Sequence, residues 1–470
     1  MPTRVLAVPH WDRRLRNPFV LNTLTGSLLA GSVVYAQAAS DSSRVIRGRI
    51  DAAVAPFVTS RDFSGAVLVA RNGRVLARKS YGLANVELGV ANTVASRFAI
   101  GSLTKTFTAA AIGRLVERGV VRLGDRAHRY VPELADTTIT IEHLLAHTAG
   151  VPDYYLMPEF AAHHADVMSL DAFARLVGGK PLTFTPGAES RYSNSGYLLL
   201  ALVIERISGM SYSEFVRQQL LRPLGMAQTG DLNERGIVPA LATGYDPAFP
   251  PDLLQPAALV HRSWLTGAGS LYSTVDDLRR WAEATRQQRA APHPALPRPY
   301  GWRANQRFGS VAFLDQSGRI PLGYTSYVAV YPDSNLIVVV LSNVQADVVE
   351  RLGIAFAAFV IAPDSAPVLP TPPRSVGGES QSRADADTLS AYAGRYEIAP
   401  GLTLTVSHSA RGLLLAGPDG IPVPLNQVAP SQFFFRPLYV AISFSRDSTG
   451  RVTALNWGGQ FTAHRAPSGS

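Results

Sequence analysis

Cysteine is absent from this chain of 470 residues. Its absence excludes a cysteine nucleophile, a zinc site with cysteine ligands, disulfide bonds and a lipid-anchored cysteine. A secreted chain without disulfides depends on its hydrophobic core for stability, and this chain is long enough to form a large one. Because the length exceeds what one core usually spans, we expect two domains.

Lysine is scarce. Lys79, Lys105 and Lys180 are the three lysines among 44 lysine and arginine residues. The formal net charge of +9 comes mostly from scattered arginines, and no basic run is interleaved with aromatic residues, so nucleic acid is not an expected partner. With 46% hydrophobic and 17% charged residues, the composition is that of a globular chain.

Long apolar runs are absent beyond the first forty residues, so no later segment is expected to span a bilayer. Residues 1–38 resemble a signal peptide, with a basic segment ending at Arg16, an apolar stretch over 19–34 and a small-x-small cleavage site at Ala36–Ala38. An uncleaved membrane anchor is the alternative, but the apolar stretch is short and contains Asn and Thr. We therefore predict export to the periplasm or the medium, with membrane contact only through this segment.

The order of the expected elements indicates an α+β fold for residues 39–362. A β-hairpin is predicted with Asn72-Gly73 at its turn, and residues 166–225 are predicted to be mostly helical with one interrupting loop. Early and late strands can then form one antiparallel sheet with helices packed on it. The later strands are expected at 308–315, 324–332 and 335–343.

The C-terminal part differs in composition. Residues 363–387 are rich in Pro, Ser and Gly without apolar periodicity, which predicts a linker. Residues 388–470 consist of short β-rich runs separated by turns. This pattern predicts a small, barrel-like all-β domain.

Ser102 and Lys105 lie at the start of an apolar helical pattern. Residues three apart share a face of a helix, and a lysine can lose its proton whereas an arginine cannot. The positive potential at a helix start favours an alkoxide and a neutral amine, so the pair can form a nucleophile and its activator. The alternative is a serine that caps the helix and a surface lysine, which is the commoner meaning of Ser-x-x-Lys.

Tyr192 and Asn194 lie in the loop that interrupts the helical region, after Pro186-Gly187. A tyrosine beside a cation can act as a general base or acid, and an asparagine beside it can bind a substrate amide. When this pair is considered alone, a tyrosine at a loop edge and an asparagine in a turn is the better interpretation.

Taken together, these motifs resemble the serine β-lactamase and penicillin-binding-protein superfamily. Within it they resemble the class C-like branch of class C β-lactamases, D-alanyl-D-alanine carboxypeptidases, D-aminopeptidases and β-lactamase-like esterases. The resemblance extends over residues 45–345, in family order. It is carried by "IGSLTKTFTAAAI", "LLAHTAGVPDY", "FTPGAESRYSNSGY", "RPLGM" and "GAGSLYSTVDDLRRW".

The resemblance implies an antiparallel sheet flanked by helices, a helical subdomain and no metal or organic cofactor. It implies that Ser102 is the acylated nucleophile, Lys105 the activating cation and Tyr192 the general base that then protonates the leaving group. Asn194 corresponds to a contact for the substrate amide. The family's oxyanion hole uses two backbone N–H groups. The loss of one such donor raises the activation free energy by on the order of 3 kcal/mol.

The third family motif is altered. Gln316-Ser317-Gly318 stands where members have Lys or His, then Ser or Thr, then Gly. Arg319 follows, and its N–H corresponds to the second oxyanion donor. Because side chains alternate along a strand, Ser317 and Arg319 are expected to face the cleft and Gln316 the other side. Arg319 either supplies a charge for a substrate carboxylate or blocks the site, and the missing cation favours esters or uncharged peptides over β-lactams.

Other possible catalytic or metal-binding motifs in the sequence are less well supported. His143 and His147 have a spacing that can hold zinc on a helix, which is predicted to end at Gly150, but structural histidines are the favoured interpretation. A Gly-x-Ser-x-Gly motif is absent, which argues against an α/β-hydrolase. Asp276 and Asp277 are better explained by capping of a helix than by paired catalytic carboxylates.

The sequence therefore predicts an exported serine hydrolase that acts through an ester on Ser102. Its expected substrate is a small molecule or peptide, namely an ester, a D-amino-acid peptide or amide, a β-lactam or a peptidoglycan stem peptide. A catalytically impaired, penicillin-binding-like protein that serves as a binding module is the alternative, because the third motif is altered.

Overall fold

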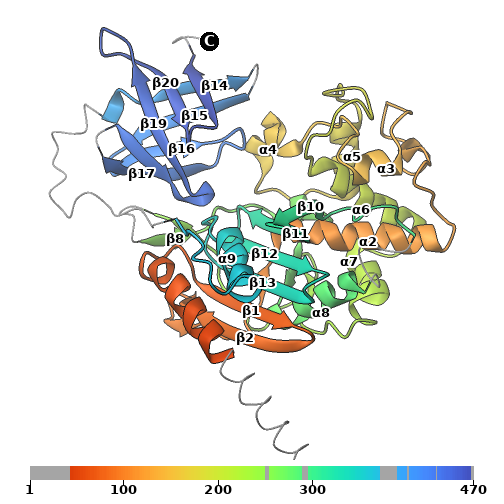
Figure 1. Ribbon diagram of the computed structural model, residues 1–470. Helices are drawn as coiled ribbons and strands as arrows, with labels where there is room; N and C mark the ends of the chain where they lie inside the picture. Colours follow the sequence, from red (N-terminus) through yellow and green to blue (C-terminus); the bar gives the residue numbers. More distant parts are fainter. Residues whose placement is uncertain are drawn as a thin grey trace, which may run out of the picture. The chain divides into compact units, whose positions relative to one another are not determined.

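The structure is a computed structural model that describes residues 43–248, 253–287, 295–370, 389–399, 402–429 and 431–466 (Figure 1). Its internal contacts divide the chain into two units, residues 1–46 and 47–470. The expected signal peptide, residues 1–38, and residues 371–387 of the expected linker lie outside the described residues, so both stay predictions. No helix in the described ranges is long and apolar enough to cross a membrane.

A six-stranded antiparallel sheet forms the centre of the large domain, in the order β10-β11-β12-β13-β1-β2 (Figure 1). The predicted hairpin is confirmed, because Asn72 and Gly73 adopt φ of +52° and +75° between β1 and β2. Early and late strands pair directly, as predicted. The strands are β1 (Gly65–Arg71), β2 (Arg74–Tyr81), β10 (Arg303–Phe308), β11 (Val311–Ile320), β12 (Tyr324–Tyr331) and β13 (Leu336–Ser342).

Helices cover both faces of this sheet. Val328 of β12 belongs to the main core cluster, which also contains Trp281 of α8 (Val275–Arg286). On the opposite face, Tyr327 lies against Gly353 of α9 (Val349–Ile361), where a Cβ would collide with the tyrosine ring. Because strand side chains alternate, neighbouring residues of β12 hold a different helix on each side.

A helical subdomain lies between the early and the late strands in the sequence, as predicted. Its central helix is α6, in which every residue from Ser195 to Ile204 is buried. Helix α3 ends at Leu145, before the expected end at Gly150. The helices are α2 (Thr104–Glu117), α3 (Ile141–Leu145), α4 (Pro158–His163), α5 (Leu170–Gly178), α6 (Ser195–Ser208) and α7 (Tyr212–Val216).

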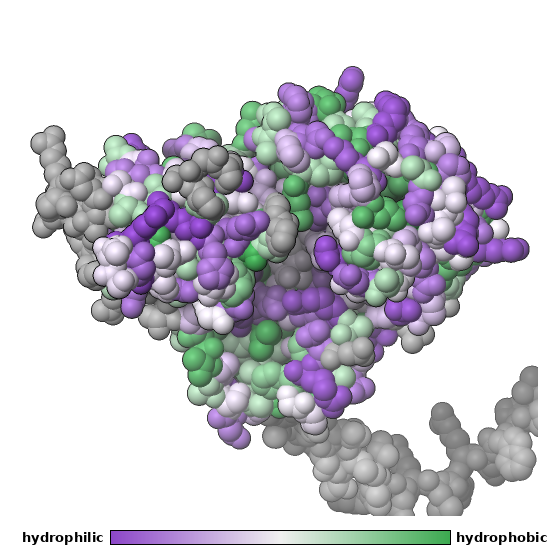
Figure 2. Space-filling model, turned by 90° about the horizontal axis from the view of Figure 1, so that it is seen from above, coloured by the Kyte–Doolittle hydropathy of each residue, from purple (hydrophilic) through white to green (hydrophobic). Residues whose placement is uncertain are grey.

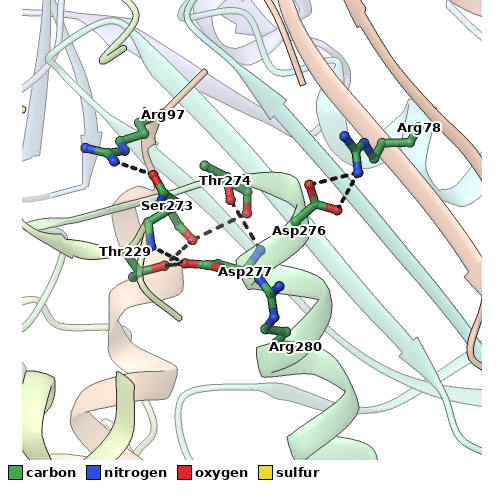
Figure 3. A network of polar contacts seen from close by, with 9 residues as sticks. Arg78, Arg97, Thr229, Ser273, Thr274, Asp276, Asp277 and Arg280 are labelled. Carbon is green, nitrogen blue, oxygen red and sulfur yellow. Dashed lines mark hydrogen bonds and ion pairs between the residues drawn. The ribbon is translucent and has the colours of Figure 1, made fainter. Parts of the chain in front are cut away.

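The start of α8 is held by a polar network (Figure 3). The Thr274 hydroxyl accepts the backbone N–H of Asp277 at 3.3 Å. The buried carboxylate of Asp277 accepts the Thr229 hydroxyl at 2.9 Å, whereas Asp276 turns to Arg78 at 3.3 Å. The two carboxylates therefore have separate structural partners, and the capping interpretation is confirmed.

The C-terminal part forms a closed antiparallel β-barrel of strands β14 to β21, so the barrel-like prediction is confirmed. Pairing of β14 with β21 closes it. The strands are β14 (Gly394–Ala399), β15 (Leu402–Ser409), β16 (Gly412–Ala416), β17 (Pro422–Ala429), β18 (Gln432–Phe435), β19 (Val440–Arg446), β20 (Val452–Trp457) and β21 (Phe461–Arg465).

A buried ion pair joins the barrel to the large domain. Arg436, which follows β18, donates from Nε to Asp62 Oδ1 at 2.5 Å, and both side chains are only 1% exposed. Tyr439 donates its hydroxyl to Asp62 Oδ2 at 3.2 Å. A charge this deeply buried needs its counter-ion, so the contact is a fixed part of the fold.

Candidate active site

Ser102 lies in a 3-10 turn, Gly101–Leu103, directly before α2. The N-cap of α2 is Leu103, and the side chain of Ser102 makes no capping hydrogen bond. Gly101 has φ of +54°, and a Cβ there would lie 2.9 Å from the backbone nitrogen of Arg319. Glycine at this position therefore lets the serine turn pack closely on β11, and the interpretation of Ser102 as a helix cap is wrong.

Lys105 is fully buried beside Ser102. Its Nζ lies 3.2 Å from Ser102 Oγ, 2.8 Å from Asn194 Oδ1 and 2.9 Å from the Ala268 carbonyl oxygen. Desolvation lowers the pKa of Lys105 to about 7, against the raising effect of the charge on Asp153.

This geometry suits the amine in either protonation state, because three acceptors surround Nζ of Lys105. A neutral amine has two hydrogens and one lone pair. The amide and carbonyl oxygens of Asn194 and Ala268 can only accept, so they receive the two hydrogens of Lys105. The protonated form donates its third hydrogen to Ser102 Oγ. In the neutral form the lone pair faces the hydroxyl of Ser102, which can then transfer its proton to Lys105.

Tyr192 contacts the serine from another side. Its hydroxyl donates to Ser102 Oγ at 2.7 Å. Desolvation in the cleft raises the pKa of Tyr192, although 49% of the side chain is exposed, and the negative charge of Asp153 raises it further. A phenol with a raised pKa stays protonated, so the directions of these two pKa shifts favour Lys105 over Tyr192 as the first proton acceptor.

Asp153 controls how Asn194 is oriented. Nδ2 of Asn194 donates to Asp153 Oδ2 at 3.1 Å, which leaves Oδ1 directed at Lys105. Asp153 is largely buried, and burial raises the pKa of its carboxyl group. Its role was missed from the sequence, where it appears only within the quoted stretch "GVPDY".

The third motif lies along β11, and the expected orientation of Gln316 is wrong. Its Nε2 donates to the backbone carbonyl of Ser102 at 3.4 Å, so Gln316 faces the turn Gly101–Leu103. Gly318 shares that face, where a Cβ would collide with the Ile100 carbonyl. Arg319 lines the cleft, as expected, and there it pairs with Asp347, at 3.7 Å between Nη1 and Oδ2.

All of the predicted site residues line one cleft of about 790 Å³. The face shown in Figure 2 is hollowed near its centre, where hydrophilic residues are visible. The predicted residues that line the cleft are Ser102, Lys105, Tyr192, Asn194, Gln316, Ser317, Gly318 and Arg319.

The two histidines with zinc-like spacing serve different contacts. Because α3 ends at Leu145, His143 and His147 do not share a helix. His143 Nδ1 accepts the backbone N–H of Thr140 at 3.3 Å as part of a capping box. The described residues contain no group of three or more His, Asp or Glu that could hold a metal ion.

His147 packs against Tyr192. Its Nδ1 accepts the backbone N–H of Ser193 at 3.1 Å, and its ring centre lies 4.7 Å from that of Tyr192 and 5.1 Å from that of Tyr197. Desolvation lowers the pKa of His147 to about 3, so the imidazole is neutral at physiological pH. Its φ of +59° is unusual for a residue other than glycine, and such strain is retained where the surrounding contacts hold it.

We expect His147→Ala to lower kcat for ester hydrolysis by about 10- to 100-fold with a smaller change in KM, because a small displacement of Tyr192 impairs proton transfer. Steady-state kinetics on a nitrophenyl ester measures both constants. His143→Ala, four residues away, is the matched control and should retain kcat. A rise in KM at unchanged kcat would assign His147 to substrate binding instead.

These features agree with the comparison with known proteins. The chain belongs to the Beta-lactamase family, whose pattern matches residues 50–361. Members of this family are generally serine hydrolases. Residues 379–467, which include the barrel, match a domain of unknown function, DUF3471.

Particular relatives resemble most of the chain. Penicillin-binding protein 4* of Bacillus subtilis (strain 168) is 29% identical over 412 residues, covering 82% of this chain and 90% of that protein. The octameric penicillin-binding protein homologue from Pyrococcus abyssi superposes with a TM-score of 0.59 at 22% identity, covering 88% of this chain and 99% of that chain. D-amino acid amidase from Ochrobactrum anthropi SV3 superposes with a TM-score of 0.55 at 24% identity, covering 65% of this chain and 91% of that chain. At these identities the two structures show a shared fold.

Proposed function

We propose that this protein is an exported serine hydrolase that forms an acyl-enzyme on Ser102, with esters or D-amino-acid peptides and amides as substrates. One observation carries the proposal: Ser102 Oγ contacts both the buried amine of Lys105 and the hydroxyl of Tyr192 inside a cleft. The neutral Gln316 in the third motif is the reason for placing esters and peptides before β-lactams. The signal-like segment 1–38 is the reason for proposing export.

In the proposed reaction, Ser102 Oγ bonds to the substrate carbonyl carbon while its proton moves to Lys105. The negative charge on the carbonyl oxygen is stabilised by backbone N–H groups, for which those of Ser102 and Arg319 are the candidates. The leaving group takes a proton from Tyr192, and the protonated Lys105 restores that proton. Water then attacks the ester, releases the acid and regenerates Ser102.

A fluorophosphonate probe tests the nucleophile. We expect the mature chain to be labelled on Ser102, with Ser102→Ala unlabelled and the exposed Ser310→Ala labelled as the wild type is. Mass spectrometry of the digested protein identifies the labelled residue. Absence of label from the folded wild-type protein would contradict the enzyme proposal and favour the alternative of a binding module.

A further inference from the structure

An acidic side chain of the barrel lines the catalytic cleft. Asp419 lies in the turn between β16 and β17, and it borders the same cleft as Ser102. The turn is held against the large domain, because Ile421 packs on the main core cluster and a Cβ on Gly420 would lie 3.5 Å from the Ala161 side chain. The barrel therefore contributes a charge to the site.

Asp419 and Tyr192 share a charged neighbour. The charge of Arg319 acts on the pKa of Asp419 and also on that of Tyr192, whose hydroxyl donates to Ser102. The tyrosine and the barrel carboxylate are thus within electrostatic reach of the same arginine.

The cations that line the cleft already have partners. Lys105 has a pKa lowered to about 7 by burial, so it loses its charge above that pH. Arg319 forms an ion pair with Asp347, so its charge is already balanced and is not available to a substrate carboxylate. The ion pairs of the cleft arginines are Arg298 with Glu142 at 3.5 Å, Arg303 with Asp315 at 2.6 Å and Arg319 with Asp347 at 3.7 Å.

Asp419 differs from these groups. Among the described residues no cation lies within ion-pair distance of its carboxylate, and Oδ1 accepts the backbone N–H of Ile421 at 3.2 Å. A carboxylate offers about four lone-pair positions, so it can accept further hydrogens. Burial raises the pKa of Asp419, and a bound cation would oppose that effect.

We propose that Asp419 forms a subsite for a positively charged amino group on the acyl part of the substrate. The preferred substrates are then amides, peptides or esters with a free amine rather than those with a free carboxylate on that side. This inference rests on the proposed acyl-enzyme function and names its substrate class.

The test compares two substrates that differ in one charge, D-alanine p-nitroanilide and its N-acetyl derivative. We expect the wild type to prefer the free amine by at least about tenfold in kcat/KM, which corresponds to about 1.4 kcal/mol. Asp419→Asn keeps an acceptor for the Ile421 N–H and removes the charge. It should abolish most of this preference, chiefly by lowering kcat/KM for the substrate with the free amine.

Asp447→Asn is the matched control, because Asp447 also accepts turn N–H groups in the barrel and does not line the cleft. If neither anilide turns over, protection of Ser102 against the fluorophosphonate by D-alanine amide and by N-acetyl-D-alanine amide gives the same comparison. Labelling of Ser102 with no preference for the amine, or with a preference that Asp419→Asn does not change, overturns the subsite alone. Absence of labelling overturns the proposed function itself.

Discussion

Replacing Lys105 with arginine is expected to lower the rate of acylation of Ser102 by about 10²- to 10⁴-fold, the range that a general base contributes. Arginine keeps the positive charge but does not give up its proton at any pH at which the protein is folded. Lys105 is buried where desolvation lowers its pKa to about 7, so a neutral amine is available near physiological pH. The rate of labelling by a fluorophosphonate measures acylation directly.

The other two lysines provide the controls. Lys79 pairs with Asp51 and Lys180 with Glu159, and an arginine can keep both ion pairs. Lys79→Arg and Lys180→Arg should therefore label at the wild-type rate. If the deprotonated amine of Lys105 accepts the proton of Ser102, the wild-type rate should rise with pH and level off above a pKa near 7. If Lys105→Arg is labelled as rapidly as the wild type, or if the wild-type labelling rate falls as the pH rises past 7, Lys105 is not the base.

Removing the carboxylate of Asp62 is expected to lower the free energy of unfolding by about 3 to 5 kcal/mol. Arg436 is 1% exposed and would be left buried without its counter-ion. Urea unfolding of the purified chain, followed by circular dichroism and by fluorescence, measures the loss. A separate early transition would show that the barrel has come loose from the large domain.

A half-exposed pair gives the comparison for this variant. Arg78 and Asp276 are 44% and 30% exposed, so Asp276→Ala should cost no more than about 1 kcal/mol. The double variant Asp62→Leu with Arg436→Met removes both charges and should recover part of the stability. If the double variant is no more stable than Asp62→Ala, an uncompensated buried charge is not the cause of the loss.

Much of the fold followed from local patterns. The Asn72-Gly73 turn identified the first hairpin, and the β-rich runs at 324–332 and 335–343 identified the late strands that join it in one sheet. Ser102, Lys105 and Tyr192 line one cleft. This grouping could be predicted because the family motifs that contain the three residues were recognised together. Helix α9 was not predicted, since nine of its thirteen residues are buried and its apolar residues therefore do not form one stripe.

The parts of the site that the sequence did not reveal depend on contacts between distant segments. Asp153 acts through Asn194, far along the chain, and no spacing rule links the two. The orientation of Gln316 depends on how β11 packs against the catalytic turn, where a shift of one residue reverses the side chain. Asp419 enters the cleft from another domain, so no pattern within the hydrolase segment could indicate it.

The central sheet also sets the time at which the protein can fold. β1 is hydrogen-bonded on one side to β2, its neighbour in sequence, and on the other to β13, so that Arg71 meets Leu336. The inner side of the hairpin therefore has no partner until nearly the whole large domain, through β13, is available to fold. Such long-range pairing slows folding, because the loop between the strands must close before their contacts form. The turn Gly101–Leu103 packs on β11. It is consequently formed only after the late strands have joined the sheet.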